Sequence, residues 1–273
     1  MNNKRKSILF RAVLCVLILA SLSVSLIGCN IIRDARDLIG ALDDLSKTYK
    51  SVGDFSIQFN EELSTCSILG ISDAGKDKEE LIIPKELDGM SVVGIGWFWY
   101  SSIISPTLKK LFWAGDQAIY NQIVVNDCPV LDNVIFTSAD PTVYEQFFDK
   151  TRVYGFGRNT HVILIDEVKQ WVIEHSDDYY VSETIINSPS PNVEYYYNYE
   201  ISPNSGYAWI DYLEYDEQIK TVPQNPTRDG YEFTGWYFDR ECNQKADLNN
   251  VVKGEENIAF YAGWGKVDTA ESA

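Results

Sequence analysis

Two stretches of the chain repeat each other at an offset of 23 residues. LKKLFWAG begins at Leu108, and LDNVIFTS begins at Leu131. Across this offset Leu108 meets Leu131, Leu111 meets Val134, Phe112 meets Ile135 and Trp113 meets Phe136. A fixed period of roughly 20–50 residues is typical of solenoids, in which each unit buries its apolar face only against its neighbours. The repeat therefore predicts a short, capped solenoid.

The segment before the repeat has the pattern of short strands and tight turns. Alternating apolar residues over 55–59 and a β-rich run over 65–71 predict a hairpin. EELIIPKELDGMSVVGIG, which begins at Glu79, contains a short strand and then a turn with glycine. It resembles the leucine-rich repeats of BspA-like surface proteins through Leu81-Ile82-Ile83-Pro84, Asp88-Gly89, Val92 and Ile95-Gly96. The resemblance implies that residues 53–188 form a leucine-rich repeat domain.

The end of this domain is compatible with two structures. HVILIDEVKQWVIE, residues 161–174, fits a helix or a pair of strands, and Leu164, Val168 and Trp171 at helical spacing favour the helix. The following NSPSPN, residues 187–192, is rich in turn formers, so we expect a domain boundary there.

The beginning of the chain has the composition of an export signal. Basic residues precede an apolar run over 12–28 that is short and serine-rich for a bilayer span, which takes about 20 apolar residues. The run ends in Leu26-Ile27-Gly28-Cys29, which resembles the lipobox of bacterial lipoproteins. The resemblance implies a signal peptide over 1–28 and a lipid on Cys29 that anchors an extracytoplasmic protein to the bacterial cell membrane. A plain cleaved signal and an uncleaved helix are the alternatives.

A short amphipathic segment follows the lipobox. Apolar residues recur there at steps of four and three, at Ile31, Ala35, Leu38, Leu42, Leu45 and Tyr49. This spacing places them on one side of a helix, so residues 29–52 are expected to form a lipid-anchored helical tether that packs on the next domain. A partner-binding helix and a frayed tether are the alternatives.

Residues 193–265 have a separate aromatic pattern, which includes PQNPTRDGYEFTGWYFD and AFYAGW. It resembles the Listeria-Bacteroides repeat, known also as the B-repeat of internalin-type surface proteins. The matching positions are Pro223, Pro226, Arg228, Gly230, Tyr231, Phe233, Gly235, Trp236, Tyr237, Phe260, Tyr261, Ala262 and Trp264. The resemblance implies a small β-rich, β-grasp-like module, followed by a tail over 266–273. The expected fold class is therefore mainly β: a short N-terminal helix, a leucine-rich solenoid and this module.

Tyrosines at the start of this module are the candidate contact residues. Tyr195, Tyr196, Tyr197 and Tyr199 lie in or near a possible strand, whose alternation must expose some of them. Tyrosine is enriched at protein interfaces. Trp236 and Trp264 occupy positions expected in the core, although stacking on a sugar is the alternative.

The sequence contains no recognisable catalytic or metal centre, and we expect neither a cofactor nor an enzyme. His161 and His175 are the only histidines. Outside the signal and Cys29, three cysteines remain, Cys66, Cys128 and Cys242, which allow at most one disulfide and lack zinc-site spacing. We expect Cys128 to be a buried turn thiol. Acidic groups such as Asp177-Asp178 and Asp211 with Asp216-Glu217 follow no EF-hand loop, so solvated loop acids are expected.

Charge narrows the choice of partner. All 40 acidic residues but only 19 of the 23 basic ones follow residue 28, and the difference between 19 and 40 gives the exported part a formal charge of −21. This charge argues against nucleic acid, whose phosphates attract basic proteins. We therefore expect a lipid-anchored surface protein that binds a protein or glycan, in a non-enzymatic or adhesive role. A cell-envelope hydrolase and a carbohydrate-binding lipoprotein are the alternatives.

Overall fold

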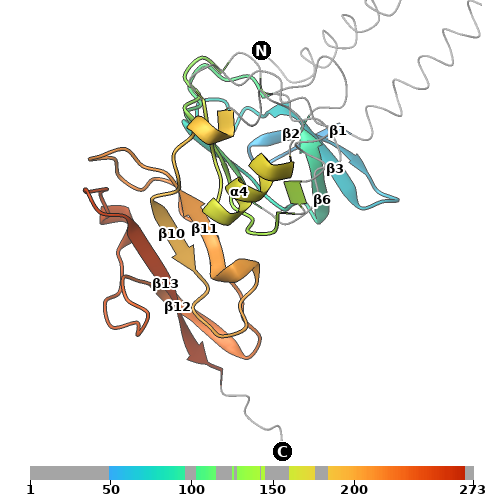
Figure 1. The fold of residues 1–273 in the computed structure, drawn as a ribbon. Helices are drawn as coiled ribbons and strands as arrows, with labels where there is room; N and C mark the ends of the chain where they lie inside the picture. The colour runs from blue at the N-terminus through green and yellow to red at the C-terminus, as the bar shows by residue number, and fades with distance from the viewer. Residues whose placement is uncertain are drawn as a thin grey trace, which may run out of the picture. The chain divides into compact units, whose positions relative to one another are not determined.

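The structure is a computed structural model that describes residues 49–95, 103–114, 125, 128–141, 143–144, 160–175 and 184–267. The fold is mainly β, as expected, and the described strands form three sheets (Figure 1). The signal peptide, the lipobox with Cys29, and Asp177-Asp178 lie outside the described residues. No helix in the described ranges is both long and apolar enough to cross a membrane. Residues Tyr49–Ala273 cluster as one compact unit.

The first sheet confirms the predicted hairpin and corrects the end of the predicted tether. Its strands, in spatial order, are β1 (Tyr49–Val52), β2 (Phe55–Asn60), β3 (Thr65–Ile71), β6 (Met90–Ile95) and β5 (Glu86–Leu87). The helix predicted to reach residue 52 is wrong over its last four positions, which form β1. Backbone pairing with β2 and an ion pair from Lys50 to Asp88 at 2.5 Å hold this strand, and such tertiary contacts override a local helical pattern.

The turn between β5 and β6 is the Asp-Gly turn expected from the sequence. Asp88 and Gly89 both have positive φ, 53° and 75°. Two adjacent residues of this kind form the hairpin turn whose twist matches that of the strands, and Asp-Gly is a preferred pair for it.

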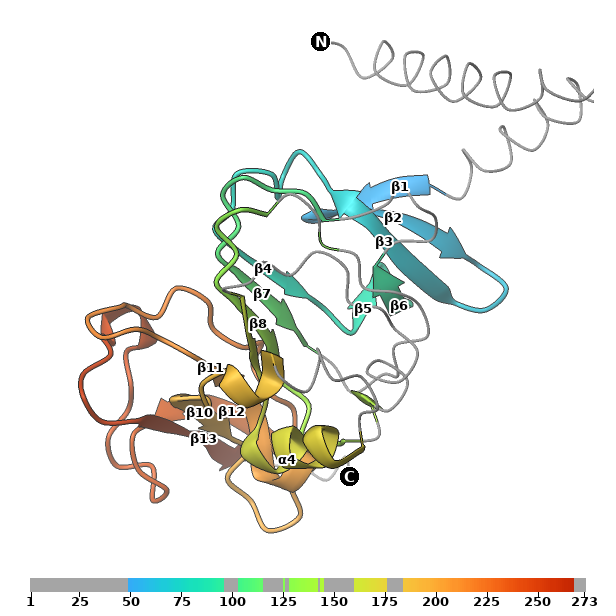
Figure 2. The same cartoon turned by 45° about the horizontal axis from the view of Figure 1, so that its top comes forward.

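The second sheet is parallel, and its strands follow one another along the chain. β4 (Glu80–Ile83), β7 (Lys110–Trp113), β8 (Asn133–Phe136) and β9 (His161–Ile163) lie in that order. Figure 2 labels the first three of them side by side. The register pairs Leu111 with Val134, Phe112 with Ile135 and Trp113 with Phe136, as the 23-residue repeat predicts. Sequential parallel strands are the arrangement of a solenoid.

The segment 161–174 contains a strand and a helix in succession. β9 ends at Ile163, and α4 (Asp166–His175) follows after two residues. The helix prediction is confirmed for Val168, which is buried, and for Trp171, whereas Leu164 lies before the helix. Two acids in the first turn, Asp166 and Glu167, favour helix initiation there.

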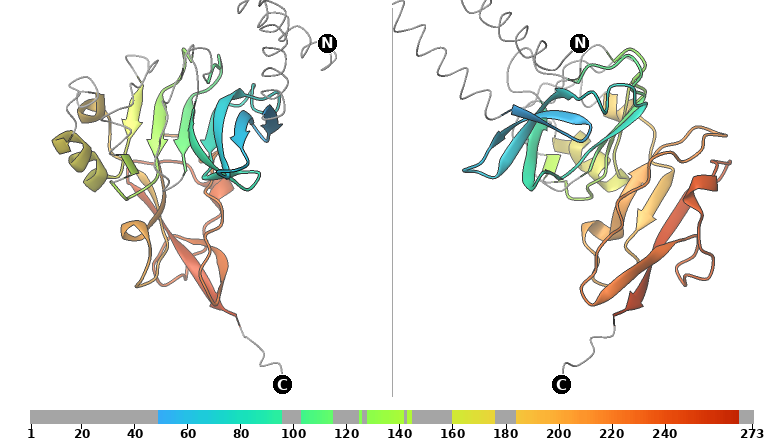
Figure 3. Two further views of the ribbon diagram at one scale, coloured as in Figure 1. Left: turned by 90° about the vertical axis from the view of Figure 1, so that its right-hand side faces the viewer. Right: turned by 180° about the vertical axis from the view of Figure 1, so that it is seen from behind.

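The third sheet belongs to the C-terminal segment and is mixed. Its order is β11 (Tyr207–Asp211), β10 (Val193–Tyr196), β13 (Ile258–Lys266) and β12 (Tyr231–Tyr237). β10 and β13 are parallel, whereas the two outer pairs are antiparallel. Figure 3 shows β12 and β13 as the long ribbon at the C-terminal end. The core face of this third sheet holds Tyr195, Trp236 and Phe260, which are all buried. The prediction of a β-rich module is therefore confirmed.

Both faces of the two central strands of the parallel sheet are buried, because the C-terminal segment covers one face of the sheet. All four residues of β7 and of β8 are buried. On the covered face, Phe112 stacks on Trp209 of β11, and β8 contacts β11 (Figure 2). Lys220 also pairs with Glu79, just before β4, at 2.9 Å. This sheet face is therefore occupied from within the chain.

The predicted boundary segment 187–192 is held by several hydrogen bonds. The backbone N–H of Val162 donates to Ser188 Oγ at 2.7 Å, and Lys169 donates to the Ser188 carbonyl. Asn192 Nδ2 donates to the Leu213 carbonyl at 2.8 Å. The division into domains at this segment stays a prediction.

Candidate contact surface

A row of four tyrosines crosses the outer face of the C-terminal sheet. Tyr207 of β11 lies opposite Tyr196 of β10, Tyr196 lies opposite Tyr261 of β13, and Tyr261 lies opposite Tyr237 of β12. All four side chains are partly exposed. Side chains directly opposite one another on paired strands share a face, so one residue from every strand contributes to this tyrosine row.

The rings of the row pack against one another rather than lying flat on the sheet. The centroid of Tyr196 is 4.9 Å from that of Tyr207 and 5.4 Å from that of Tyr261. The Tyr196 and Tyr261 rings are stacked, with an interplanar angle of 15°. Because Tyr196 has a neighbouring ring on each side, the row presents ring edges and hydroxyl groups outward.

Glycines make room for the end of the row. A Cβ added at Gly263 would lie 2.3 Å from Cε2 of Tyr237 and 2.4 Å from Oγ1 of Thr234. Contacts this short would force the Tyr237 ring to move. Gly263 thus lets that ring lie over β13, which accounts for a glycine between Tyr261 and Trp264.

Charged groups border the row. The Tyr196 hydroxyl donates to Glu194 Oε2 at 2.7 Å, and the Arg240 guanidinium lies 5.2 Å from the centroid of Tyr261. Burial, followed by the hydrogen bond to Glu194, raises the pKa of Tyr196 well above its usual value. The row is thus a neutral aromatic strip between a carboxylate and a guanidinium.

The predicted contact tyrosines separate into three environments. Tyr195 is fully buried against Trp236 and Phe260, so its assignment to the contact surface is wrong; it lies on the core face because its neighbour Tyr196 takes the outer one. Tyr196 belongs to the row. Tyr197 and Tyr199 are partly exposed and lie beyond the end of β10.

A second aromatic cluster surrounds Arg228. Its guanidinium lies 3.7 Å from the ring centroid of Tyr231 and 4.6 Å from that of Tyr199. Trp264 meets Tyr199 edge to face, and its indole N–H donates to the Tyr197 carbonyl at 2.6 Å. Trp236 is a core residue, as expected, and Trp264 packs against the core while remaining partly exposed.

A buried lysine joins the parallel sheet to the C-terminal sheet. Lys110 Nζ lies 3.0 Å from Glu217 Oε1 and 3.7 Å from Asp211 Oδ1, and it donates to the Tyr212 carbonyl. The side chains of Lys110 and Asp211 are only 4% and 2% exposed. The expectation of a solvated acid is therefore wrong for Asp211, because β11 carries it under the parallel sheet; Asp216 is exposed, as expected.

One cation faces two carboxylates at this place. Burial raises the pKa of Asp211 to about 7, and the Lys110 charge opposes this rise only in part. Lys110 lies closer to Glu217, so it compensates the Glu217 charge first.

The remaining candidate residues lie apart from one another. Cys66 and Cys242 are free thiols, and burial raises the pKa of Cys66 to about 11. Cys128 is half-buried, with Sγ 3.6 Å from the Ile103 carbonyl. His175 stacks on Trp171 of its own helix. In the portion of the chain that the structure describes, no group of three or more His, Cys, Asp or Glu could hold a metal ion.

The comparisons with known proteins agree with the C-terminal part of this description. Residues 193–263 match the family model of the Listeria-Bacteroides repeat domain. Domains of this family occur in surface-associated proteins and are typical of bacterial surface proteins. A comparison with curated proteins finds no match.

The tyrosine row was only partly accessible to sequence reasoning. The run Tyr195-Tyr196-Tyr197 led to Tyr196. Tyr237 and Tyr261 were named only as positions of the family pattern, and Tyr207 was not named, because the three are far apart in the chain. The sequence does show tyrosines in several strand-like segments. Only the pairing of the strands shows which of these tyrosines lie side by side.

Proposed function

We propose that the protein is a lipid-anchored cell-surface protein with a non-enzymatic, protein-binding or adhesive role, and that the tyrosine row is its contact surface. The observation that carries this proposal is the alignment of Tyr207, Tyr196, Tyr261 and Tyr237 across all four strands on the face opposite the core. Tyrosine offers a large, rigid contact area and a hydroxyl for hydrogen bonding, which suits protein interfaces.

A protein partner suits the row better than a glycan. Sugars stack on exposed faces of aromatic rings, but both sides of the Tyr196 ring are occupied by Tyr207 and Tyr261. Edges and hydroxyl groups complement polypeptide surfaces. The glycan-binding alternative therefore depends on the ends of the row and has less support.

The covered sheet face limits where a partner binds. The outward face of the parallel sheet is less suited to a partner, because its residues Lys110 and Phe112 are buried against β11. The same burial bears on the hydrolase alternative, because Asp211 and Glu217 are paired with Lys110 rather than placed in an open pocket. The proposal therefore assigns binding to the C-terminal sheet.

The leucine-rich repeat assignment and the lipid anchor are parts of the proposal that rest on sequence resemblance. The parallel order β4, β7, β8, β9 supports the repeat assignment. For the anchor, Cys29→Ser should leave an uncleaved precursor and abolish labelling by a fatty-acid analogue. Persistent labelling of that variant would rule out Cys29 as the lipid site.

Photocrosslinking on intact cells tests the binding role. A photoreactive phenylalanine analogue placed at Tyr261 samples the row, and the same analogue at Tyr215, which is 67% exposed outside it, is the matched control. We expect a discrete crosslinked partner from Tyr261 and none from Tyr215. Equal crosslinking at both positions would contradict a specific contact surface.

A further inference from the structure

β13 is longer than the strand that pairs with it on one side. β12 pairs with β13 as far as Tyr237 opposite Tyr261, but β13 begins at Ile258. On the other side, these first residues pair with β10. Among the strands that the structure describes, none pairs with Ile258–Phe260 on the β12 side.

Ala259 directs its backbone groups to this open side. The N–H of Ile258 donates to the Asn192 carbonyl, on the β10 side, at 2.9 Å. Because consecutive residues of a strand direct their N–H and C=O groups to opposite neighbours, those of Ala259 point away from β10. A donor and an acceptor directed outward from one residue are what an added strand pairs with.

The neighbouring edge of the same sheet is covered. Lys245 crosses β12 and donates from Nζ to the Thr234 carbonyl at 2.6 Å. Gly235 permits this crossing, because it has φ of +131° and a Cβ there would lie 2.6 Å from Cε of Lys245. A bulge between Phe233 and Gly235 adds to the irregularity. Lysines and bulges commonly prevent strand addition. The outer edge of β12 is therefore protected, whereas the edge of β13 at Ile258–Phe260 is open.

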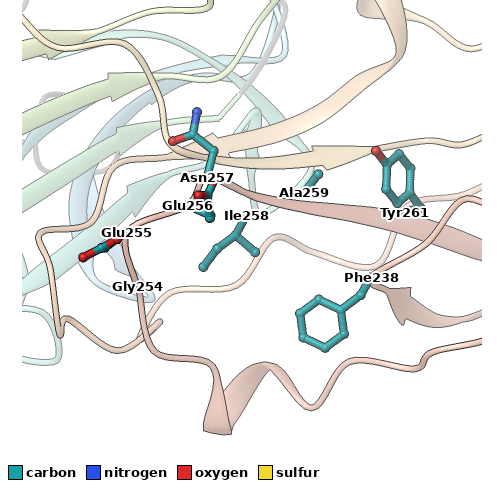
Figure 4. A pocket seen from close by; sticks show the side chains of 8 residues that line it. All are labelled: Phe238, Gly254, Glu255, Glu256, Asn257, Ile258, Ala259 and Tyr261. Atoms are coloured by element: carbon teal, nitrogen blue, oxygen red, sulfur yellow. The ribbon is translucent and has the colours of Figure 1, made fainter.

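The open edge borders a pocket of about 510 Å³ that has apolar and acidic walls (Figure 4). Phe238, 44% exposed, and Ile258 form an apolar wall on one side of β13. Glu255 and Glu256 are exposed at the end of the pocket, and neither carboxylate makes an ion pair within the described residues.

The buried Lys253 forms no ion pair with these acids within the described residues. Lys253 Nζ donates to the backbone carbonyls of Gly254 and Glu256, at 2.7 and 2.9 Å. These bonds fix the loop beside the open edge. The carboxylates of Glu255 and Glu256 can therefore pair with cationic side chains of a partner. Charge complementarity thus favours a basic occupant.

We propose that the edge of β13 at Ala259 binds an extended segment of another protein in which basic and apolar residues alternate. The segment pairs with the Ala259 N–H and C=O as an added strand. Alternate side chains point to opposite faces, so apolar ones reach Phe238 and Ile258 while basic ones lie near Glu255 and Glu256. The inference rests on the proposed binding role of the C-terminal sheet, but it concerns an edge beside the tyrosine row.

A labelled synthetic peptide that alternates lysine and valine tests the proposal by fluorescence anisotropy against the purified full chain in detergent. Ala259→Pro removes the outward N–H without removing a hydrogen bond to β10, a place where sheets tolerate proline. We expect it to weaken binding at least tenfold. An alternating glutamate and valine peptide should not bind.

Charge reversal provides a variant that does not alter the backbone. The double variant Glu255→Lys with Glu256→Lys should weaken the binding of the lysine peptide at least tenfold. It should also allow the glutamate peptide to bind. The matched control is Glu61→Lys with Glu62→Lys, an adjacent exposed pair in the turn between β2 and β3, which should leave binding unchanged.

The peptide itself distinguishes strand addition from simple charge attraction. N-methylation of alternate residues removes backbone donors and keeps the charge, so it should abolish binding. Equal binding of the methylated peptide, or equal effects of the two charge reversals, would overturn the proposal. Self-association of the protein that Ala259→Pro abolishes would also overturn it, because a second copy would then occupy the edge. Tyr261 also lines this pocket, so crosslinking at Tyr207, at the opposite end of the row on β11, separates the two proposals. Failure of peptide binding leaves crosslinking at Tyr207 unaffected.

Discussion

The ring of Phe112 in β7 stacks on the ring of Trp209 in β11, with centroids 5.1 Å apart and an interplanar angle of 26°. The two residues come from different sheets and are both buried. Their contact covers the face of the parallel sheet that a solenoid would otherwise present to a partner. The C-terminal segment therefore takes this place itself and directs its own opposite face, with the tyrosine row, outward.

Trp209→Ala should destabilise the protein by about 3–5 kcal/mol, because it removes a large buried ring and leaves a cavity. Denaturant unfolding of the purified chain measures this change. Tyr215→Ala is the control, since an exposed tyrosine should change stability by less than about 0.5 kcal/mol. Equal unfolding midpoints for the two variants would show that the stacked pair contributes little.

The pH dependence of stability should contain a contribution from Asp211. Its pKa is about 7 in the folded protein and 3.8 as an ordinary carboxyl, so the folded state holds a proton that the unfolded state releases. Stability from this group is therefore present at low pH and is lost as the pH rises from about 4 to about 7. Asp211→Asn should flatten the unfolding free energy over this range. A slope unchanged by the substitution would contradict the assignment.

Lys110→Met should be costly, because it leaves Asp211 and Glu217 facing each other without a cation. Removing one partner of a buried ion pair costs about 3–5 kcal/mol. We expect this loss near pH 8 and a smaller loss at pH 5, where Asp211 binds a proton. Thermal or denaturant unfolding at both pH values checks it, and adding Asp211→Asn to Lys110→Met should restore part of the stability at pH 8.

Tyr195 and Tyr196 should respond oppositely to loss of the hydroxyl group. The Tyr195 hydroxyl is buried and has no hydrogen-bond partner among the described residues, so Tyr195→Phe should be neutral or stabilising by about 1 kcal/mol. Tyr196→Phe removes the hydrogen bond to Glu194 and should destabilise by about 1 kcal/mol. Unfolding measurements on both variants decide it; a reversed order would mean that the two faces are misassigned.

The sequence predicted those features that repeat or alternate locally. The 23-residue offset predicted the register of β7 on β8, because equivalent residues of stacked units lie side by side. A turn with glycine was predicted after the strand at 80–83, and the structure forms it at Asp88-Gly89, where both φ angles are positive. Alternation also predicted that Tyr195 and Tyr196 differ in exposure, although their pairing with other strands determines which one is buried.

The features that the sequence did not reveal depend on contacts between distant segments. Lys110 looks like an exposed residue in LKKLFW, and only its contact with Asp211, far along the chain, makes it buried. Tyr49 follows the helical spacing of the tether but joins β1, because a partner strand lies close by in sequence. The tyrosine row likewise exists only once four separate strands are paired.

The most direct test of the central claim is the dissociation constant of the partner recovered by crosslinking, measured with the wild-type chain and with row variants. The account predicts that Tyr237→Ala with Tyr261→Ala weakens binding by about 2 kcal/mol or more, as tyrosine hot spots do, while Tyr215→Ala leaves the constant unchanged. Circular dichroism should confirm that the row variant is folded. A folded row variant that binds as tightly as the wild type would contradict the claim that the tyrosine row is the contact surface.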